Sequence, residues 1–184
     1  IAVFASGNGT NTENIINHFK HHPKINIALI ASNKSDSNVI KRAIQNNTLT
    51  FLFSAKDLNN GKVLQEMRRL EIDYIVLAGF LLKIPSDLIN FDPKKIINIH
   101  PSLLPLYGGK GMYGTYVHQQ VFDAKEKETG ITIHFVNEKY DDGTIIFQAK
   151  CQLNKFDTVK KIANKVHKLE QKFFPKIIET ILNE

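Results

Sequence analysis

The chain has 184 residues, 24 basic against 18 acidic side chains for a formal net charge of +6, and a hydrophobic fraction of 42%. This length suits one domain with a sizeable core, and the composition excludes a disordered chain. No apolar stretch approaches the ~18 residues that a membrane-spanning helix needs. The single cysteine, Cys151, excludes an internal disulfide and a zinc site built from cysteines.

Short apolar runs alternate with helical patterns, which is typical of βαβ units. We expect parallel strands at 1–6, 27–32, 74–79 and 96–100, and helices at about 11–21, 36–46, 60–71 and 115–124. After Gly130, the apolar runs 131–136 and 145–153 flank a turn-rich segment and predict an added hairpin. The pattern predicts an α/β fold: an open twisted sheet, mostly parallel with an antiparallel strand near the C-terminal end, and helices on both faces.

A long amphipathic helix is expected to close the chain. Seven lysines lie between Lys155 and Lys176, and apolar residues recur between them at steps of three and four. The expected apolar stripe comprises Val159, Ile162, Val166, Leu169, Phe173, Ile177 and Ile181. We interpret the lysines as a solvated helix face rather than a nucleic-acid surface, because mixed patterns of this kind are ordinary.

The first chemical signal is the segment SGNGTN, residues 6–11, between the first strand and its helix. Gly7 and Gly9 permit tight backbone geometry, and Thr10 or Asn11 is expected to cap the helix. Backbone amides at a helix N-terminus favour an anion, so the loop predicts a cradle for a monophosphate. The dinucleotide and Walker patterns both fail here. A plain connecting turn without a ligand stays equally open on this loop alone.

The second signal is NIHP, residues 98–101, at the end of an apolar run. Side chains two apart in a strand face the same way, so Asn98 and His100 can reach one ligand atom. Pro101 favours an extended His100 at the carboxyl end of the strand, where open α/β sheets bind ligands. A structural Asn and His that only complete hydrogen bonds are the alternative for an isolated pair.

A carboxylate from the turn NEKYDDGT, residues 137–144, is expected to reach the same rim. It would favour the protonated form of His100 and bring its pKa near neutrality, which suits proton transfer in both directions. Asn98 would then donate a hydrogen bond to an oxygen that becomes negative in a tetrahedral transition state. Taken alone, Asp141 and Asp142 are ordinary solvated turn formers. Direct transfer between two bound substrates ranks above a covalent route, since Ser102 has no evident base other than His100.

These motifs together resemble those of the folate-dependent formyltransferases: SGNGTN, NIHPSLLPLYGG at 98–109, and GITIHFVNEKYDDGTIIFQAK at 130–150. The similarity extends over essentially the whole chain and is greatest to the branch that acts on phosphoribosylglycinamide. The resemblance implies a Rossmann-like sheet and transfer of the formyl group of 10-formyltetrahydrofolate, as co-substrate, to the glycinamide amine in purine biosynthesis. It implies no metal.

By match to the family motifs, Asn98 polarises the formyl oxygen, His100 donates a proton, and Asp141 orients His100 and helps to move a proton through water. Gly9, Thr10, Asn11 and Glu170 match positions that bind the phosphoribosyl substrate, although Glu170 on a lysine-rich helix would otherwise be expected to be exposed. The resemblance places folate against Leu81, Leu82, Lys83, Ile84, Asn98, Asn137, Glu138, Lys139, Tyr140 and Asp141. Leu82 departs from the family pattern, because many members have arginine there.

We therefore expect a cytoplasmic one-carbon transferase, residues 1–184 forming a single formyltransferase domain. Its expected partners are small molecules, with neither nucleic acid nor membrane, in a monomer or homodimer. Two rivals stay open. A formyltetrahydrofolate deformylase would use water in place of the amine, and a basic nucleic-acid-binding domain would depend on net charge alone.

Overall fold

The computed structural model describes residues 1–90 and 94–183, and the chain divides into two compact units, Ile1–Asn98 and Ile99–Glu184. The division falls inside strand β5 (Ile96–His100). Each unit is described separately. The expected single domain over 1–184 stays a prediction.

The first unit is built on parallel strands in the order β3-β2-β1-β4-β5. Their short apolar sequences are buried on both faces in β1, β2 and β4, which is typical of a parallel sheet covered by helices. The strands before β5 are β1 (Ala2–Phe4), β2 (Leu29–Ser32), β3 (Thr50–Leu52) and β4 (Ile75–Leu77).

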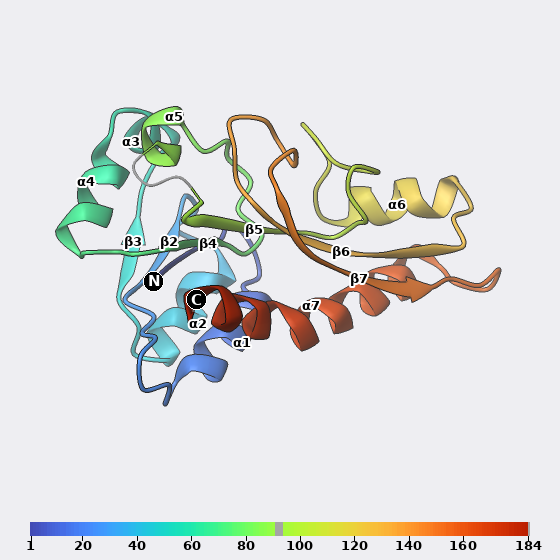
Figure 1. Ribbon diagram of the computed structural model, residues 1–184, viewed down its shortest axis with the longest axis horizontal. Coiled ribbons are helices and arrows are strands. Elements are labelled where there is room, and N and C mark those ends of the chain that lie inside the picture. Colours follow the sequence, from blue (N-terminus) through green and yellow to red (C-terminus); the bar gives the residue numbers. More distant parts are fainter. Residues whose placement is uncertain (91–93, 184) are drawn as a thin grey trace. The chain divides into compact units, whose positions relative to one another are not determined.

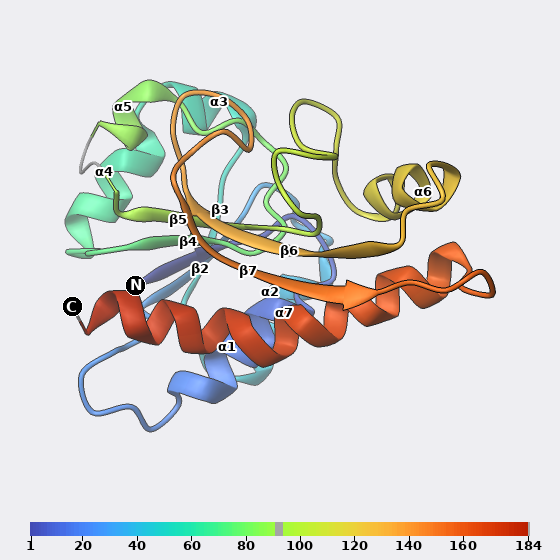
Figure 2. The same ribbon diagram turned by 45° about the vertical axis from the view of Figure 1, so that its right-hand side comes forward.

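Helices cover both faces of these strands. Parallel strands joined by right-handed crossovers place α1 and α2 on one face, and the connections after β3 and β4 on the other, because the strand order reverses direction. Figures 1 and 2 show this arrangement. The helices are α1 (Thr10–Phe19), α2 (Asn38–Gln45), α3 (Ala55–Asn59), α4 (Lys62–Arg69) and α5 (Ser86–Ile89).

Aromatic side chains fill the core of the first unit beneath the carboxyl ends of the strands. The fully buried Phe4 ring lies 5.7 Å from the ring of Phe53 and 5.5 Å from that of Phe80. Such tilted and edge-on ring pairs pack densely and fix the positions of the backbone that carries them. The loops that leave β1, β3 and β4 therefore start from a rigid base.

The second unit contains the antiparallel pair β6 (Glu128–Phe135) and β7 (Ile145–Gln152), with a register shift at Ile133/His134. Helix α7 (Val159–Leu182) packs on both strands and on helix α6 (Thr115–Asp123). The N-cap of α7 is Thr158, whose side chain accepts a hydrogen bond from the amide of Lys161. Figure 1 shows α7 running beside β7.

The predicted α/β class and mixed strand directions are confirmed, as are the strands, helices and hairpin expected from the sequence. Strand β3 and helices α3 and α5 were missed because each has only three to five residues. No helix within residues 1–90 and 94–183 is long and apolar enough to cross a membrane.

The apolar stripe of α7 differs from the expected one in its second half. Beyond Val166 the buried side chains are Phe174, Pro175, Ile178 and Ile181, whereas Phe173 and Ile177 are only half-buried. Phe174 and Ile178 thus take the buried places that the periodic pattern assigned to Phe173 and Ile177.

This shift predicts different costs for two adjacent truncations. Phe174→Ala should lower the free energy of unfolding by about 3 to 5 kcal/mol, because it empties a fully buried site. Phe173→Ala should cost clearly less, since its half-buried ring loses mainly a contact with Phe147 at 5.1 Å. Urea denaturation of both variants measures the difference, and equal losses would contradict this assignment of the buried face.

Candidate functional site

The carboxyl ends of the parallel strands in the first unit form one edge. Ala31, Phe4, Leu77 and Asn98 pair in a single row across β2, β1, β4 and β5. The strand order reverses between β1 and β4, and ligands of open α/β sheets bind at such a reversal. The loops after β1 and β4, together with the half-buried Asn98, therefore occupy the place expected for a binding site.

The loop after β1 ends in a glycine that no other residue could replace without strain. Gly9 is the N-cap of α1 with φ 75°, and a Cβ there would lie 2.7 Å from side-chain atoms of Val39. Helix α1 begins at Thr10, so the expectation that Thr10 or Asn11 caps it was wrong. Because glycine has no side chain to cap the helix, the N-terminus of α1 keeps the character of an anion-binding end.

Helix α2 holds this loop from the side. The Arg42 guanidinium donates through Nε to the carbonyl of Asn8 at 2.9 Å and forms an ion pair with Glu13 of α1. The amide of Val39 donates to the carbonyl of Gly7 at 3.2 Å. The loop is thus tied to two helices and is shaped before any ligand arrives.

The loops after β1 and β4 are linked through Ser6. Its hydroxyl donates to Oδ1 of Asn33 at 2.6 Å and accepts the amide of Leu81 at 3.1 Å. Segment 81–84, the expected pterin contact, therefore lies beside the glycine loop. Leu81 and Lys83 are exposed, Leu82 is half-buried, and Ile84 is buried and supports the segment from inside.

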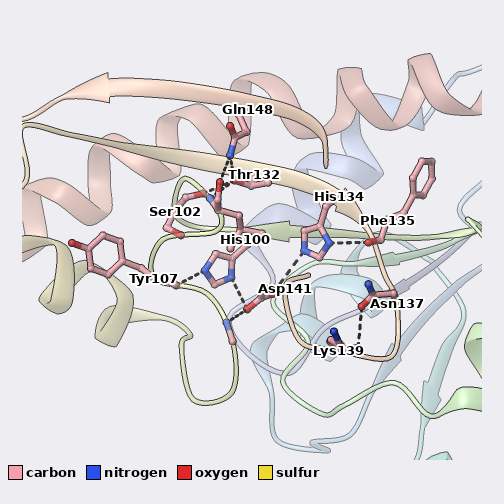
Figure 3. A network of polar contacts seen from close by, with 12 residues as sticks. His100, Ser102, Tyr107, Thr132, His134, Phe135, Asn137, Lys139, Asp141 and Gln148 are labelled. Carbon is pink, nitrogen blue, oxygen red and sulfur yellow. Dashed lines mark hydrogen bonds and ion pairs between the residues drawn. The ribbon is translucent and has the colours of Figure 1, made fainter. Parts of the chain in front are cut away.

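In the second unit, the carboxylate of Asp141 gathers polar groups from three segments (Figure 3). Its Oδ2 accepts the amide of Gly109 at 2.8 Å and lies 3.4 Å from Nδ1 of His100. Its Oδ1 lies 3.8 Å from Nε2 of His134. The expected meeting of His100 with the carboxylate of the turn is confirmed, and Asp141 rather than Asp142 supplies it.

The environment of Asp141 favours its charged form. Burial alone would raise the pKa of this carboxyl, but the neighbouring imidazoles of His134 and His100 and the hydrogen bond from the amide of Gly109 together lower it. Asp141 has φ 53°, a left-handed conformation that Asp tolerates better than most residues. The turn therefore presents an ionised carboxylate to a buried imidazole.

Burial decides the protonation of His100, which is 3% exposed. Desolvation lowers the pKa of His100 below 6.5, and His134 acts in the same direction, against opposing effects of Asp141, the Tyr107 carbonyl and Glu170. Asp141 does favour the protonated ring, as expected, because it raises the pKa of His100, but burial has the larger effect and the net shift is downward. The attraction of a carboxylate at 3.4 Å raises the pKa of His100 by less than the loss of hydration lowers it.

The contacts of the His100 ring assign the role of one nitrogen. Its Nε2 lies 2.8 Å from the carbonyl oxygen of Tyr107, which can only accept, so this nitrogen carries a hydrogen. Its Nδ1 faces Asp141 at the longer distance of 3.4 Å. Nδ1 is the atom that would gain a proton, and protonation there would turn the contact into a charge-assisted hydrogen bond.

The segment after His100 is held in place by strand β6 and by its own side chains. The hydroxyl of Thr132 donates to the carbonyl of Ser102 at 2.7 Å and accepts the amide of Leu104 at 3.0 Å. Tyr107, with φ 55°, donates its hydroxyl to Glu126 at 2.6 Å. Burial and this hydrogen bond raise the pKa of Tyr107 to about 12, so it stays a donor.

Glu170 on α7 belongs to the same unit as His100. Its side chain is only 14% exposed, and its Oε2 lies 3.1 Å from Nδ1 of His167. The hydrogen bond to Glu170 raises the pKa of His167 against the effect of burial. The exposure expected for one charge on a lysine-rich helix was therefore wrong, because this residue lies at the margin of the helix face that packs inward.

Comparison with known proteins identifies the family. The formyl transferase family matches residues 1–178. The chain belongs to this family. It is 37% identical to phosphoribosylglycinamide formyltransferase of Bacillus subtilis, over 98% of this chain and 93% of that protein.

The structural comparison agrees with the sequence comparison. Glycinamide ribonucleotide transformylase 1 from Geobacillus kaustophilus superposes with a TM-score of 0.89 at 33% identity, covering 98% of this chain and 97% of that chain. A chloroplastic phosphoribosylglycinamide formyltransferase from Arabidopsis thaliana is 34% identical over 100% of this chain. The chain spans 65% of the length of that plant protein.

The residues expected from the formyl transferase motifs fall into two groups. The first unit contains Gly9, Thr10, Asn11, Leu81, Leu82, Lys83, Ile84 and Asn98, and the second contains His100, Asn137, Glu138, Lys139, Tyr140, Asp141 and Glu170. In the turn, Asn137 accepts the amide of Lys139 at 2.9 Å, and residues 137–140 are exposed. Within the described residues, no group of His, Cys, Asp and Glu side chains could hold a metal ion.

Sequence reasoning missed His134, the second imidazole that faces Asp141. It is 2% exposed, and its Nδ1 lies 2.9 Å from the carbonyl oxygen of Phe135. The sequence ITIHF places two polar residues, Thr132 and His134, at alternate positions of an otherwise apolar strand. The structure shows that residues 129–134 of this strand are all buried. Buried polar side chains on one strand face indicate a hydrogen-bonded network.

The role of Asp141 predicts a change in the titration of His100. Asp141→Asn removes the negative charge that raises the pKa of His100, so this pKa should fall further below 6.5. NMR titration of the imidazole signals measures the change. Asp142→Asn is the matched control, because Asp142 is 56% exposed and pairs with Lys139 at 3.9 Å. An equal pKa of His100 in both variants would show that the charge of Asp141 does not affect this imidazole.

Proposed function

We propose that this protein transfers the formyl group of 10-formyltetrahydrofolate to the glycinamide amine of phosphoribosylglycinamide. The observation that carries the proposal is the contact of the buried His100, at the end of β5, with the carboxylate of Asp141, in a chain of the formyl transferase family. Relatives named phosphoribosylglycinamide formyltransferase, including one of which the chain covers 93%, support the choice of acceptor. The same proposal includes a role in purine biosynthesis, and we propose the cytoplasm as its location.

The formyl carbon is the point of attack. The amine of the acceptor adds to this carbon, and the carbonyl oxygen gains negative charge in the tetrahedral intermediate. Asn98 is two residues before His100 on β5, so strand geometry sends both side chains to one face. The Asn98 amide donates to the developing oxyanion, an interaction that is stronger in the transition state than in the ground state.

His100 and Asp141 serve the transfer of a proton between the two substrates. The attacking amine must lose one proton, and the folate nitrogen must gain one as its bond to the formyl carbon breaks. His100 takes the proton from the attacking amine and delivers it to the folate nitrogen as the bond to the formyl carbon breaks, and the charged Asp141 stabilises the intervening imidazolium. Water exclusion around a 3% exposed ring strengthens this electrostatic stabilisation.

The acceptor is proposed to bind at two places through groups of different chemistry. Its phosphate takes the N-terminus of α1, where Gly9, Thr10 and Asn11 present backbone amides and no side chain caps the helix. Its ribose hydroxyls donate to the carboxylate of Glu170. A carboxylate suits hydroxyl donors and disfavours a second phosphate.

The folate is proposed to lie against segment 81–84 and the turn 137–141. Leu81 and Leu82 supply apolar surface, and the backbone of both segments supplies polar groups for a flat heterocycle. Lys83 and Lys139 are exposed and are available for the acidic tail of the co-substrate. No residue in this scheme holds a metal ion.

The proposal is tested by following the loss of 10-formyltetrahydrofolate by absorbance with and without phosphoribosylglycinamide. Turnover should require the acceptor. His100→Ala should lower kcat about 10²- to 10⁴-fold and Asn98→Ala about 10²- to 10³-fold, since they remove proton transfer and an oxyanion donor. His21→Ala, at an exposed histidine in a turn, is the control and should keep the parent rate. Formate release without the acceptor would instead indicate a deformylase.

A second test addresses the phosphate loop. Gly9→Ala should raise the KM for the acceptor about 10- to 150-fold, because its Cβ collides with Val39 and displaces amides that make charge-assisted bonds. Gly61→Ala is matched, since Gly61 is also a helix N-cap with positive φ, 82°, but has no atom closer than 3.8 Å. That control should lose stability without a change in KM. An unchanged KM for the acceptor in Gly9→Ala would contradict the proposal that this loop binds the phosphate.

A further inference from the structure

Residues 107–109 contact both members of the pair formed by His100 and Asp141 (Figure 3). The carbonyl oxygen of Tyr107 lies 2.8 Å from Nε2 of His100. The amide of Gly109 donates at 2.8 Å to Oδ2 of Asp141, the same oxygen that lies 3.4 Å from Nδ1 of His100. The imidazole, the carboxylate and segment 107–109 therefore form a closed ring of contacts, in which the position of the segment affects how the imidazole faces the carboxylate.

The conformation of Tyr107 depends on contacts that hold it in place. Tyr107 has φ 55°, and a left-handed conformation is unfavourable for a residue with a large side chain. The hydroxyl of Thr132 holds the carbonyl of Ser102 and the amide of Leu104, and both of these groups precede Tyr107 in the chain. A further contact is therefore needed to hold the segment at Tyr107 itself.

Glu126 supplies this contact. The Tyr107 hydroxyl donates to Oε1 of Glu126 at 2.6 Å, the length of a charge-assisted hydrogen bond to a carboxylate. Glu126 lies between α6 and β6, and its amide donates to the carbonyl of Val121 at 3.3 Å. Val121 is 1% exposed, so the carboxylate that holds Tyr107 is attached to the buried side of α6.

We propose that Glu126 is a positioning residue that acts through the Tyr107 hydroxyl and keeps the Tyr107 carbonyl on Nε2 of His100. The His100 ring then has a fixed orientation before a substrate binds. This inference rests on the proposed function, which gives His100 its task in proton transfer. The scheme above places neither Glu126 nor the Tyr107 hydroxyl against a substrate, so both act on the reaction through His100.

The first test observes His100 in the ligand-free protein and does not depend on turnover. Tyr107→Phe keeps the aromatic ring and removes the hydroxyl, so the hydrogen bond to Nε2 should be lost in part of the molecules. Nitrogen-15 NMR above the pKa of His100 should show both neutral tautomers in the variant and the Nε2–H tautomer alone in the parent. The pKa of His100 should also fall further below 6.5, because the Tyr107 carbonyl raises it.

The second test measures kcat and KM. Tyr107→Phe and Glu126→Ala should each lower kcat about 3- to 10-fold, the effect of one hydrogen bond, with KM for both substrates near the parent values. Glu126→Gln keeps an oxygen acceptor for the hydroxyl and should retain most of the parent kcat. The variant that combines Tyr107→Phe with Glu126→Ala should lose no more than Tyr107→Phe alone, because the two side chains act through one bond.

Glu128→Ala is the matched control. Glu128 is a carboxylate two residues further along the chain, and it accepts hydrogen bonds from Lys150 at 2.7 Å and from Gln152 at 3.3 Å. Its removal should leave the His100 tautomer and kcat unchanged. A change in Glu128→Ala as large as that in Glu126→Ala would overturn the inference, since any nearby carboxylate would then have the same effect.

Three other outcomes would overturn it. Tyr107→Phe with the parent's tautomer and kcat, but a lower free energy of unfolding, would show that the bond to Glu126 only stabilises the fold. Equal losses in Glu126→Gln and Glu126→Ala would show that the charge matters and not the held position. Additive losses in the combined variant would show that Glu126 acts by another route.

The two proposals can fail separately. A parent protein that does not formylate phosphoribosylglycinamide would overturn the proposed function, whereas a changed tautomer in Tyr107→Phe would still support the role of Glu126 in positioning the His100 ring. A parent that formylates the acceptor, with an unchanged tautomer and kcat in Tyr107→Phe, would overturn this inference alone.

Discussion

The half-buried carboxylate of Asp141 connects three segments of the second unit. Asp141 holds the amide of Gly109 and faces two imidazoles, and each of these groups comes from a different segment of the chain. The turn that supplies Asp141 depends in turn on β6, where a Cβ at Gly143 would lie 1.7 Å from the carbonyl oxygen of Phe135. The proton chemistry of His100 is the balance between burial, which favours the neutral ring, and this carboxylate, which favours the charged one. A substrate that adds negative charge beside the ring shifts that balance toward the imidazolium.

Each unit holds a different part of the proposed site. The first unit contains rigid strand ends, a helix N-terminus without a side-chain cap, and a neighbouring segment with exposed apolar residues. The second contains the buried His100 and the half-buried carboxylates of Asp141 and Glu170, which are less screened by water than surface charges are. Strand β5 is common to both, because Asn98 ends one unit and His100 lies just inside the next. Under the proposed function, the oriented amides of the first unit would serve the phosphate and the imidazole of the second would serve the proton.

The long periodic elements and the pairing of His100 with the YDDG turn could be predicted from the sequence, because hydrophobic period and turn composition are local signals. Short elements such as β3 and α5 could not, since three or four residues show no period. The direction of the net pKa shift of His100 could not be predicted from the sequence. A motif indicates that a carboxylate lies near the ring, but the desolvation that lowers the pKa of His100 depends on side chains distant in sequence. The same applies to His134 and His118, whose burial only the folded chain reveals.

The hydroxyl of Ser6 has a consequence for the mobility of the strand ends in the first unit. A single oxygen donates to Asn33 and accepts the amide of Leu81, so the segments that follow three strands are joined at one atom. None of these segments can move away from the other two without breaking one of the two hydrogen bonds. The loss of one hydroxyl group would therefore loosen three connections that lie far apart in the sequence.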